Sequence, residues 1–290
     1  MAQALHLHSL ASLDKQSNNS RSTRTPPEIS SIFPGAFCHY LPVLIIEGLL
    51  AGVLIGSVLG FIGAGGAMLS VPILIYGFDF SASHATTAAL AVVLLAAASG
   101  LVPKFKSKDV LIKEALIICA LGLTTNISTS LIAYRLSERF ILTGFSLVLL
   151  LAGSSMLIKP FNSGPERKMP AWALVVVSLV IGLMTGLFGI GGGFLAIPIL
   201  VLFFQVPQNK AAGTSLLIIV LNSITAFIGH YKIWAEVNWA TPIAMAISAV
   251  IVAQLASGKS AHVSPVILKS SFAALLFSIS AFTLLNAWVF

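Results

Sequence analysis

The residues of this chain that are best suited to chemistry are glycines and hydroxyl side chains that recur in its two halves. Glycine lets a ligand approach backbone N–H groups closely, and Ser and Thr add hydroxyl donors. At a helix N-terminus, where N–H groups lack partners and the dipole is positive, such residues can replace the water that an oxyanion sheds on entering a membrane. The candidate substrate-binding residues are Gly63, Gly65, Gly66, Thr86, Thr87, Gly191, Gly192, Gly193, Thr214, Ser215 and Asn222.

A duplicated pattern sets the spacing of these residues. Glycines at 56, 60, 63, 65 and 66 precede Pro72, and glycines at 182, 186, 189, 191 and 192 precede Pro198, which lies 126 residues after Pro72. Close helix packing explains the four-residue spacings at 56/60 and 182/186. It does not explain the tight runs at 63–66 and 191–193, because a glycine inside a helix costs about 1 kcal/mol relative to alanine. We therefore expect broken helices whose breaks face each other near the membrane centre, an arrangement typical of transporters.

Each candidate side chain also has a structural interpretation. The hydroxyls suit helix capping or interhelical hydrogen bonds. His84 and Lys210 occupy equivalent places, 126 residues apart. They are candidate vestibule cations, or interfacial residues that extend their charged ends to water. Asn222 lies within two turns of Thr214 and Ser215, so it is either a cavity-lining amide or the partner of another buried polar group.

Composition places the chain in a lipid bilayer. Of its 290 residues, 57% are hydrophobic and 9% are charged, whereas about a quarter of the residues in a soluble domain are charged. Eight windows of membrane-spanning length lack Asp, Glu, Lys and Arg, namely 48–66, 85–102, 115–133, 141–158, 171–190, 211–229, 237–256 and 270–290. Two shorter apolar stretches, 67–78 and 194–206, follow the glycine runs. The predicted fold is an all-α polytopic membrane protein with two homologous repeats of transmembrane helices and Gly-broken short or re-entrant segments.

The predicted organisation has four parts: a polar, disordered tail at 1–40, transmembrane repeat 1 at 41–158, a cytoplasmic linker at 159–170 and transmembrane repeat 2 at 171–290. Lys104, Lys106 and Lys108 mark a second hydrophilic loop. The positive-inside rule places this loop and the linker in the cytoplasm. If the two short stretches cross the membrane, the repeats are inverted, and if they only re-enter, the repeats are parallel. Both topologies remain open at this point.

The motifs in combination resemble those of one membrane family. They are the twice-occurring G-x-x-x-G-x-x-G-x-G-G, the proline six residues later, and Ala-Gly-Thr-Ser-Leu at 212–216. Over nearly all of 41–290 the chain resembles the sulfite exporter (TauE/SafE-like) permeases. This resemblance implies secondary transport, without ATP hydrolysis, of a small sulfur-containing anion such as sulfite, a sulfonate or sulfoacetate. The first half departs from the pattern, with Thr87-Ala88-Ala89 in place of Gly213-Thr214-Ser215.

The same reasoning yields expectations about partners and location. We expect no enzymatic activity, since the sequence contains no Walker A, H-E-x-x-H or G-x-S-x-G motif. We expect no cofactor and no metal. The expected partners are a small anionic substrate and the lipid bilayer but no nucleic acid, and a homodimer is compatible with this reading. The expected location is the inner (plasma) membrane, with multiple passes. A cation transporter using carbonyls at the glycine breaks, an intramembrane enzyme and a non-transporting membrane scaffold are the alternatives.

Overall fold

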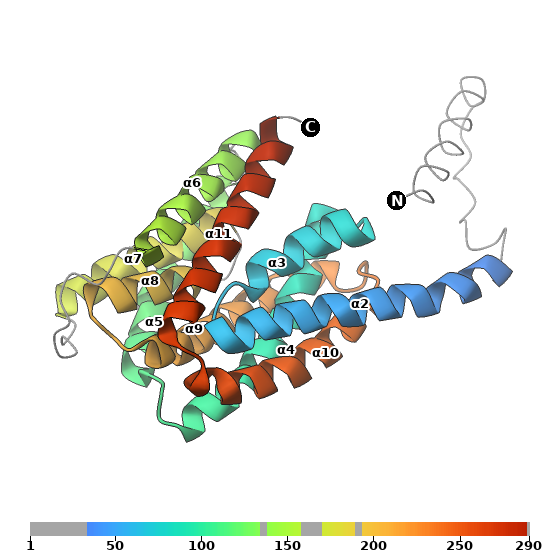
Figure 1. Ribbon diagram of the computed structural model, residues 1–290. Coiled ribbons are helices and arrows are strands. Elements are labelled where there is room, and N and C mark those ends of the chain that lie inside the picture. Colours follow the sequence, from blue (N-terminus) through green and yellow to red (C-terminus); the bar gives the residue numbers. More distant parts are fainter. Residues whose placement is uncertain (1–33, 134–137, 158–169, 189–192, 289–290) are drawn as a thin grey trace. The chain divides into compact units, whose positions relative to one another are not determined.

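Backbone exposed to lipid must satisfy its own hydrogen bonds, so apolar segments of this length are expected to be helical. The computed structural model describes residues 34–133, 138–157, 170–188 and 193–288, and every regular element within these ranges is a helix (Figure 1). The α-helices are α2 (Pro34–Ile62), α3 (Gly66–Pro72), α4 (Ala82–Lys106), α5 (Ile112–Ala133), α6 (Glu138–Leu157), α7 (Ala171–Phe188), α8 (Gly193–Phe203), α9 (Gln208–Gly229), α10 (Ala240–Lys259) and α11 (Pro265–Trp288). A π-helical turn, η2 (Ile73–Gly77), continues α3, and two 3₁₀ turns, η3 (Tyr231–Ile233) and η4 (Ser260–His262), follow α9 and α10.

Within the described ranges, five helical segments are long and apolar enough to cross a membrane. They are Val43–Ile62, Ser83–Lys106, Gln208–Gly229, Ala240–Lys259 and Val266–Leu285. Large apolar side chains such as Leu50, Leu151 and Trp172 are exposed, as expected for a surface that contacts lipid. These helices confirm the prediction of an all-α polytopic membrane protein.

The chain divides into two units, 1–43 and 44–290, and the contacts that follow lie within the second. A row of glycines on α2 brings this helix against α10. Cβ atoms built at Gly48, Gly52, Gly56 and Gly60 would meet Thr241, Met245, Ala249 and Ala253 in that order. Both rows ascend together, so α2 and α10 run in the same direction. The packing interpretation of the 56/60 spacing is thereby confirmed.

Helices α5 and α7 form a second close pair. A Cβ atom on Gly182 of α7 would overlap the backbone of Gly122 in α5. The hydroxyl of Thr125 donates to the carbonyl oxygen of Leu179 (3.2 Å), and four residues later Thr129 donates to that of Leu183 (3.4 Å). These contacts also ascend together, so α5 and α7 are parallel neighbours.

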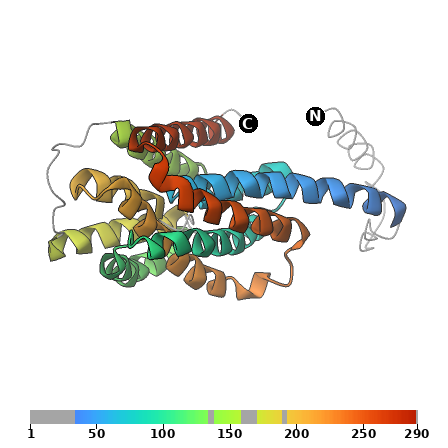
Figure 2. The ribbon, with the colours of Figure 1, turned by 60° about the horizontal axis from the view of Figure 1, so that its bottom comes forward.

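Two further pairs, α4 with α9 and α6 with α11, run antiparallel. Thr87, near the start of α4, hydrogen bonds with His230, directly after α9. In the other pair, Trp288 at the end of α11 donates from Nε1 to the hydroxyl of Thr143, near the start of α6 (3.1 Å). Figure 2 shows α6 and α11 side by side, as Figure 1 does.

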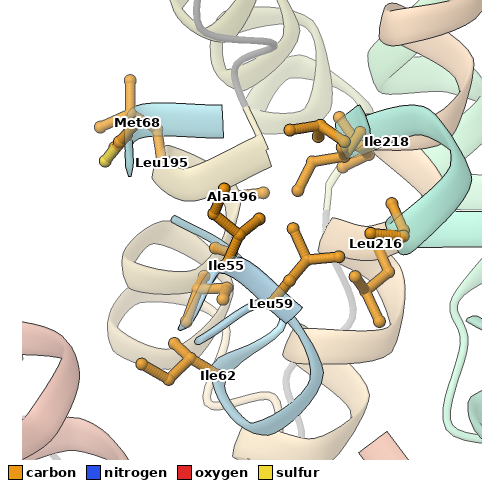
Figure 3. Packing of buried hydrophobic residues seen from close by; sticks show 14 of the residues in the cluster. Ile55, Leu59, Ile62, Met68, Leu195, Ala196, Leu216 and Ile218 are labelled. Carbon is orange, nitrogen blue, oxygen red and sulfur yellow. The ribbon is translucent and has the colours of Figure 1, made fainter. Parts of the chain in front are cut away.

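The apolar core is shared among these helices. Figure 3 shows part of it, with buried side chains from α2, α3, α8 and α9 meeting in one cluster; the labelled members are Ile55, Leu59, Ile62, Met68, Leu195, Ala196, Leu216 and Ile218. Met68 follows the first glycine run, and Leu195 and Ala196 follow the second. The segments after both runs are therefore anchored in the protein interior, where backbone outside a regular helix is tolerated at membrane depth.

The first glycine run lies where α2 gives way to α3. Helix α2 ends at Ile62, and α3 begins at Gly66. Between them Gly63 has a φ of 82° and Gly65 a φ of 91°, both in the left-handed region that favours glycine. In the second run, Gly191 and Gly192 lie outside the described residues, whereas Gly193 begins α8. The predicted meeting of the two breaks therefore also falls outside the described residues.

Candidate functional site

The first group of candidate residues joins α2 to α3, and its first glycine lies against the start of α9. A Cβ atom on Gly63 would fall 2.6 Å from Cα of Ala212, so only glycine allows this approach of the two backbones. Gly65 is the residue directly before α3, and as a glycine it has no side chain that could cap this helix. The carbonyl of Gly66 accepts a hydrogen bond from the buried hydroxyl of Ser70 (2.6 Å). All three glycines are buried.

The second group joins the start of α8 to α9. Ser215, which is fully buried, donates from Oγ to the carbonyl oxygen of Gly193 (2.6 Å). A Cβ atom on Gly193 would overlap the side chain of Ile219. Two residues chosen from sequence spacing, Gly193 and Ser215, are therefore in direct contact.

The buried hydroxyl of Thr214 connects α9 to α5. It donates to the carbonyl oxygen of Lys210 (2.7 Å) and accepts from the backbone N–H of Leu111, just before α5 (3.0 Å). Thr214 thus supplies an acceptor to an N–H group at the start of a helix, which is the capping interpretation of this residue.

Two histidines lie at the start of α4, His84 on this helix and His230 directly after α9. The hydroxyl of Thr87 donates to the carbonyl oxygen of Ser83 and lies 2.9 Å from Nδ1 of His230. On the same turn, Nε2 of His84 lies 3.4 Å from a carboxylate oxygen of Glu236. Partial burial lowers the pKa of His230, because desolvation disfavours the imidazolium.

In the described arrangement, the protons of the three buried candidate hydroxyls are directed to backbone carbonyls. Thr87 donates to Ser83, Thr214 to Lys210 and Ser215 to Gly193. An anion arriving at these hydroxyls would have to compete with those acceptors. Direct hydroxyl donation therefore requires the side chains to rotate.

The remaining candidates lie on the same two helices, except for two that cannot be placed. Thr86 is on α4, and Lys210 and Asn222 are on α9; Asn222 is buried and the other two are partly buried. Each of these three is engaged by a neighbouring group. Gly191 and Gly192 lie outside the described residues. Among the residues that are described, no cluster of three His, Cys, Asp or Glu side chains could hold a metal ion.

The sequence reasoning missed the burial of one ionisable residue. Lys104, like Lys106, lies in the last turn of α4 rather than in a loop, but only 2% of the surface of Lys104 is exposed. Its Nζ donates to the hydroxyl of Ser260 (2.7 Å), which in turn donates to the carbonyl oxygen of Ser257 (2.8 Å). Lys106 and Lys108 are exposed, as expected. One signal could have revealed Lys104, since it stands 126 residues before His230 in the duplicated pattern.

Comparison with known proteins covers most of the chain. A family model described as "Sulfite exporter TauE/SafE" matches residues 48–283. A "Probable membrane transporter protein YunE" of Bacillus subtilis (strain 168) is 27% identical over 229 residues, which is 70% of this chain and 82% of that protein. A "Probable membrane transporter protein" of Xylella fastidiosa (strain Temecula1) is 29% identical over 197 residues, covering 65% of this chain and 74% of that protein.

Proposed function

The chain belongs to the sulfite exporter TauE/SafE family, and we propose that it is a secondary permease for a small sulfur-containing anion. Sulfite, a sulfonate and a sulfoacetate-like anion are the substrates considered. Membership of this family and the relatives' names indicate a membrane transporter. The preference for an anion and the location in the inner (plasma) membrane are the parts that we propose.

One observation carries the preference for an anion. Among the side chains that the structure describes, the buried polar or charged groups are hydroxyls, two amides and one ammonium, with no carboxylate. The ammonium belongs to Lys104, and the amides to Gln208 and Asn222. Such an interior holds a positive charge, and its hydroxyls become donors to an oxyanion once they rotate away from their carbonyl partners. A cation site would be expected to include buried acidic side chains, because hard cations prefer carboxylate ligands.

The carbonyls near the glycine runs also disfavour the cation alternative. The carbonyl of Gly65 accepts from the backbone N–H of Leu69, that of Gly66 from Ser70, and that of Gly193 from Ser215. A cation would have to displace or share each of these hydrogen bonds. An anion would break only the hydrogen bond of the hydroxyl that it uses, such as that of Ser215.

Within this proposal the two halves are inverted repeats, and the helix pairing supports this. Helices α4 and α9 begin 126 residues apart, and helices α2 and α7 end 126 residues apart. Helix α4 is therefore equivalent to α9, and α2 to α7. The α4–α9 pair is antiparallel, as two equivalent helices must be when their repeats have opposite orientations. The parallel pair α2–α10 corresponds to the parallel pair α7–α5, in which each helix is replaced by its equivalent from the other half.

Local backbone geometry supports the repeat independently of the helix bounds. Asp79 and Gln205, 126 residues apart, both have positive φ, at 55° and 57°. The residue after each donates its N–H to a carbonyl six residues earlier, from Phe80 to Leu74 and from Val206 to Leu200, both at 3.0 Å. The turn before α4 and the turn before α9 therefore share one uncommon conformation.

A flux assay tests the proposal. The purified protein is reconstituted into liposomes, and the movement of sulfite, thiosulfate, sulfate and a sulfonate is measured in parallel, with protein-free liposomes as the control. We expect protein-dependent flux of at least one sulfur oxyanion, without ATP. Electrogenic uptake of a metal cation, with all four anions inert, would overturn the proposal. Absence of any flux would favour the scaffold alternative.

A further inference from the structure

We propose that Lys104 and Ser260 form an anion-binding position in which the Lys104 ammonium is the charge partner of the transported anion. The inference rests on the proposed function, since it names a contact for that anion. Lys104 lies outside the set of residues chosen from the glycine and hydroxyl pattern. Its ammonium is buried and hydrogen bonds to a neutral hydroxyl rather than to a carboxylate.

The surroundings of Lys104 distinguish it from ordinary basic residues at a helix end. A lysine near a membrane surface normally extends its ammonium to water, and the exposed Lys106 and Lys108 fit this behaviour. Lys104 instead is among the largest fully buried side chains that the structure describes. The negative end of the α4 dipole favours a cation here. It does not replace the hydration that an ammonium loses on burial.

No carboxylate contacts this ammonium among the described residues. An ammonium has three N–H donors, and the hydrogen-bond partner of Nζ within the described ranges is the neutral hydroxyl of Ser260. Asp109 attracts the ammonium electrostatically, but its carboxylate accepts from Ser107 (2.8 Å) rather than from Lys104. Two charged donors therefore remain for a ligand, and an oxyanion supplies both the acceptors and a negative charge in direct contact.

The equivalent position at the other end of the α4–α9 pair differs in the way that this proposal requires. There His230 has a hydroxyl partner, Thr87. Lys104 and His230 are 126 residues apart, and so are Gly213 and Thr87. Gly213 therefore faces Lys104 where Thr87 faces His230; a Cβ atom on Gly213 would overlap the backbone carbonyl of Asp109 and lie 3.2 Å from Cβ of Lys104. Within the described residues, the neighbouring helix thus supplies a hydroxyl to His230 and none to Lys104, whose hydroxyl partner, Ser260, comes from η4 instead.

A second unsatisfied donor lies at the same end of this helix pair. Gln208 begins α9 and is 7% exposed, yet neither its side-chain nitrogen nor its oxygen has a hydrogen-bond partner among the described residues. A buried amide without partners is costly. Its presence beside the start of α9 is independent of Lys104 and also favours a polar ligand at this end.

The test measures binding rather than flux. Thermal unfolding of the purified protein in detergent is followed while sodium sulfite, sodium sulfate or sodium phosphate replaces sodium chloride at constant ionic strength. The wild type should be stabilised by an anion that it binds. Lys104→Met should raise the half-saturating concentration of that anion by about tenfold or more, the effect expected for a lost charge-assisted hydrogen bond. Lys106→Met removes the same charge from the exposed neighbour and should leave the concentration within about twofold.

Each outcome decides the proposal. Equal half-saturating concentrations for wild type and Lys104→Met would overturn it. If Lys104→Met does not fold, Lys104→Gln provides the same comparison. If neither neutral variant folds while Lys104→Arg does, the charge serves folding and the proposal is wrong. Lys104-dependent binding of phosphate alone would retain this site and refute the sulfur substrate, whereas sulfite flux unchanged in Lys104→Met would retain the substrate and refute the site.

Discussion

Substituting Gly63 with alanine should destabilise the protein strongly, because two independent costs coincide at this residue. Its φ of 82° lies in the left-handed region, which costs a residue with a Cβ atom about 1–2 kcal/mol. The new Cβ would also fall 2.5 Å from Cβ and 2.6 Å from Cα of Ala212. Backbone cannot move aside as a flexible side chain can, and overpacking costs about 1–3 kcal/mol. The expected loss is therefore about 2–5 kcal/mol.

Two other glycines separate these costs. Gly65→Ala carries the strained φ of 91°, but its Cβ would meet only the side chains of Leu275 and Val58 at 3.2 Å, so we expect a loss of about 1–2 kcal/mol. Gly77→Ala meets nothing closer than 4.0 Å and has no positive φ. It should be neutral, or stabilising by up to about 1 kcal/mol.

Thermal unfolding in detergent, monitored by intrinsic tryptophan fluorescence, ranks the three variants. The unfolding midpoint should fall by an amount on the order of 10 °C for Gly63→Ala, by less for Gly65→Ala and not at all for Gly77→Ala. If Gly63→Ala and Gly77→Ala have equal midpoints, the close approach of the α2 end to α9 is not a feature of the folded protein, and the reasoning fails.

Two further predictions concern the hydroxyls and the histidine of the candidate site. Thr214→Val and Ser215→Ala should each reduce anion flux more than Glu47→Gln, since the first two break buried hydrogen bonds worth about 0.5–1.5 kcal/mol each and Glu47 is exposed; a larger effect of Glu47→Gln in the liposome assay would contradict this. Burial lowers the pKa of His230 below about 6.5, so the unfolded chain takes up a proton at a higher pH than the folded protein does. His230 thus lowers stability as the pH falls below about 6.5. His230→Gln should reduce the difference between unfolding midpoints at pH 7.5 and 5.5, and an unchanged difference would refute this contribution.

Composition and hydropathy alone indicate that the protein is helical and lies in a membrane. Long charge-free stretches can satisfy their backbone hydrogen bonds in lipid only as helices, so the spans follow from composition without knowledge of their neighbours. The four-residue spacing of Gly56 and Gly60 indicated close helix packing, because small residues at this spacing let two helix backbones approach each other. Sequence spacing also selected Gly193 and Ser215 separately as candidates, and the structure places them in contact.

The partner of each polar group can be seen only in the folded protein, because burial and hydrogen bonding depend on helices that are distant in the sequence. Lys104 has the same local sequence signals as Lys106, yet α10 and η4 enclose the first and leave the second exposed. The hydroxyl of Thr214 faces α5 rather than an open cavity because Leu111 lies beside it. The sequence shows that Lys104 is charged. The loss of hydration that makes this charge require a partner arises only when helices from both halves pack around the side chain.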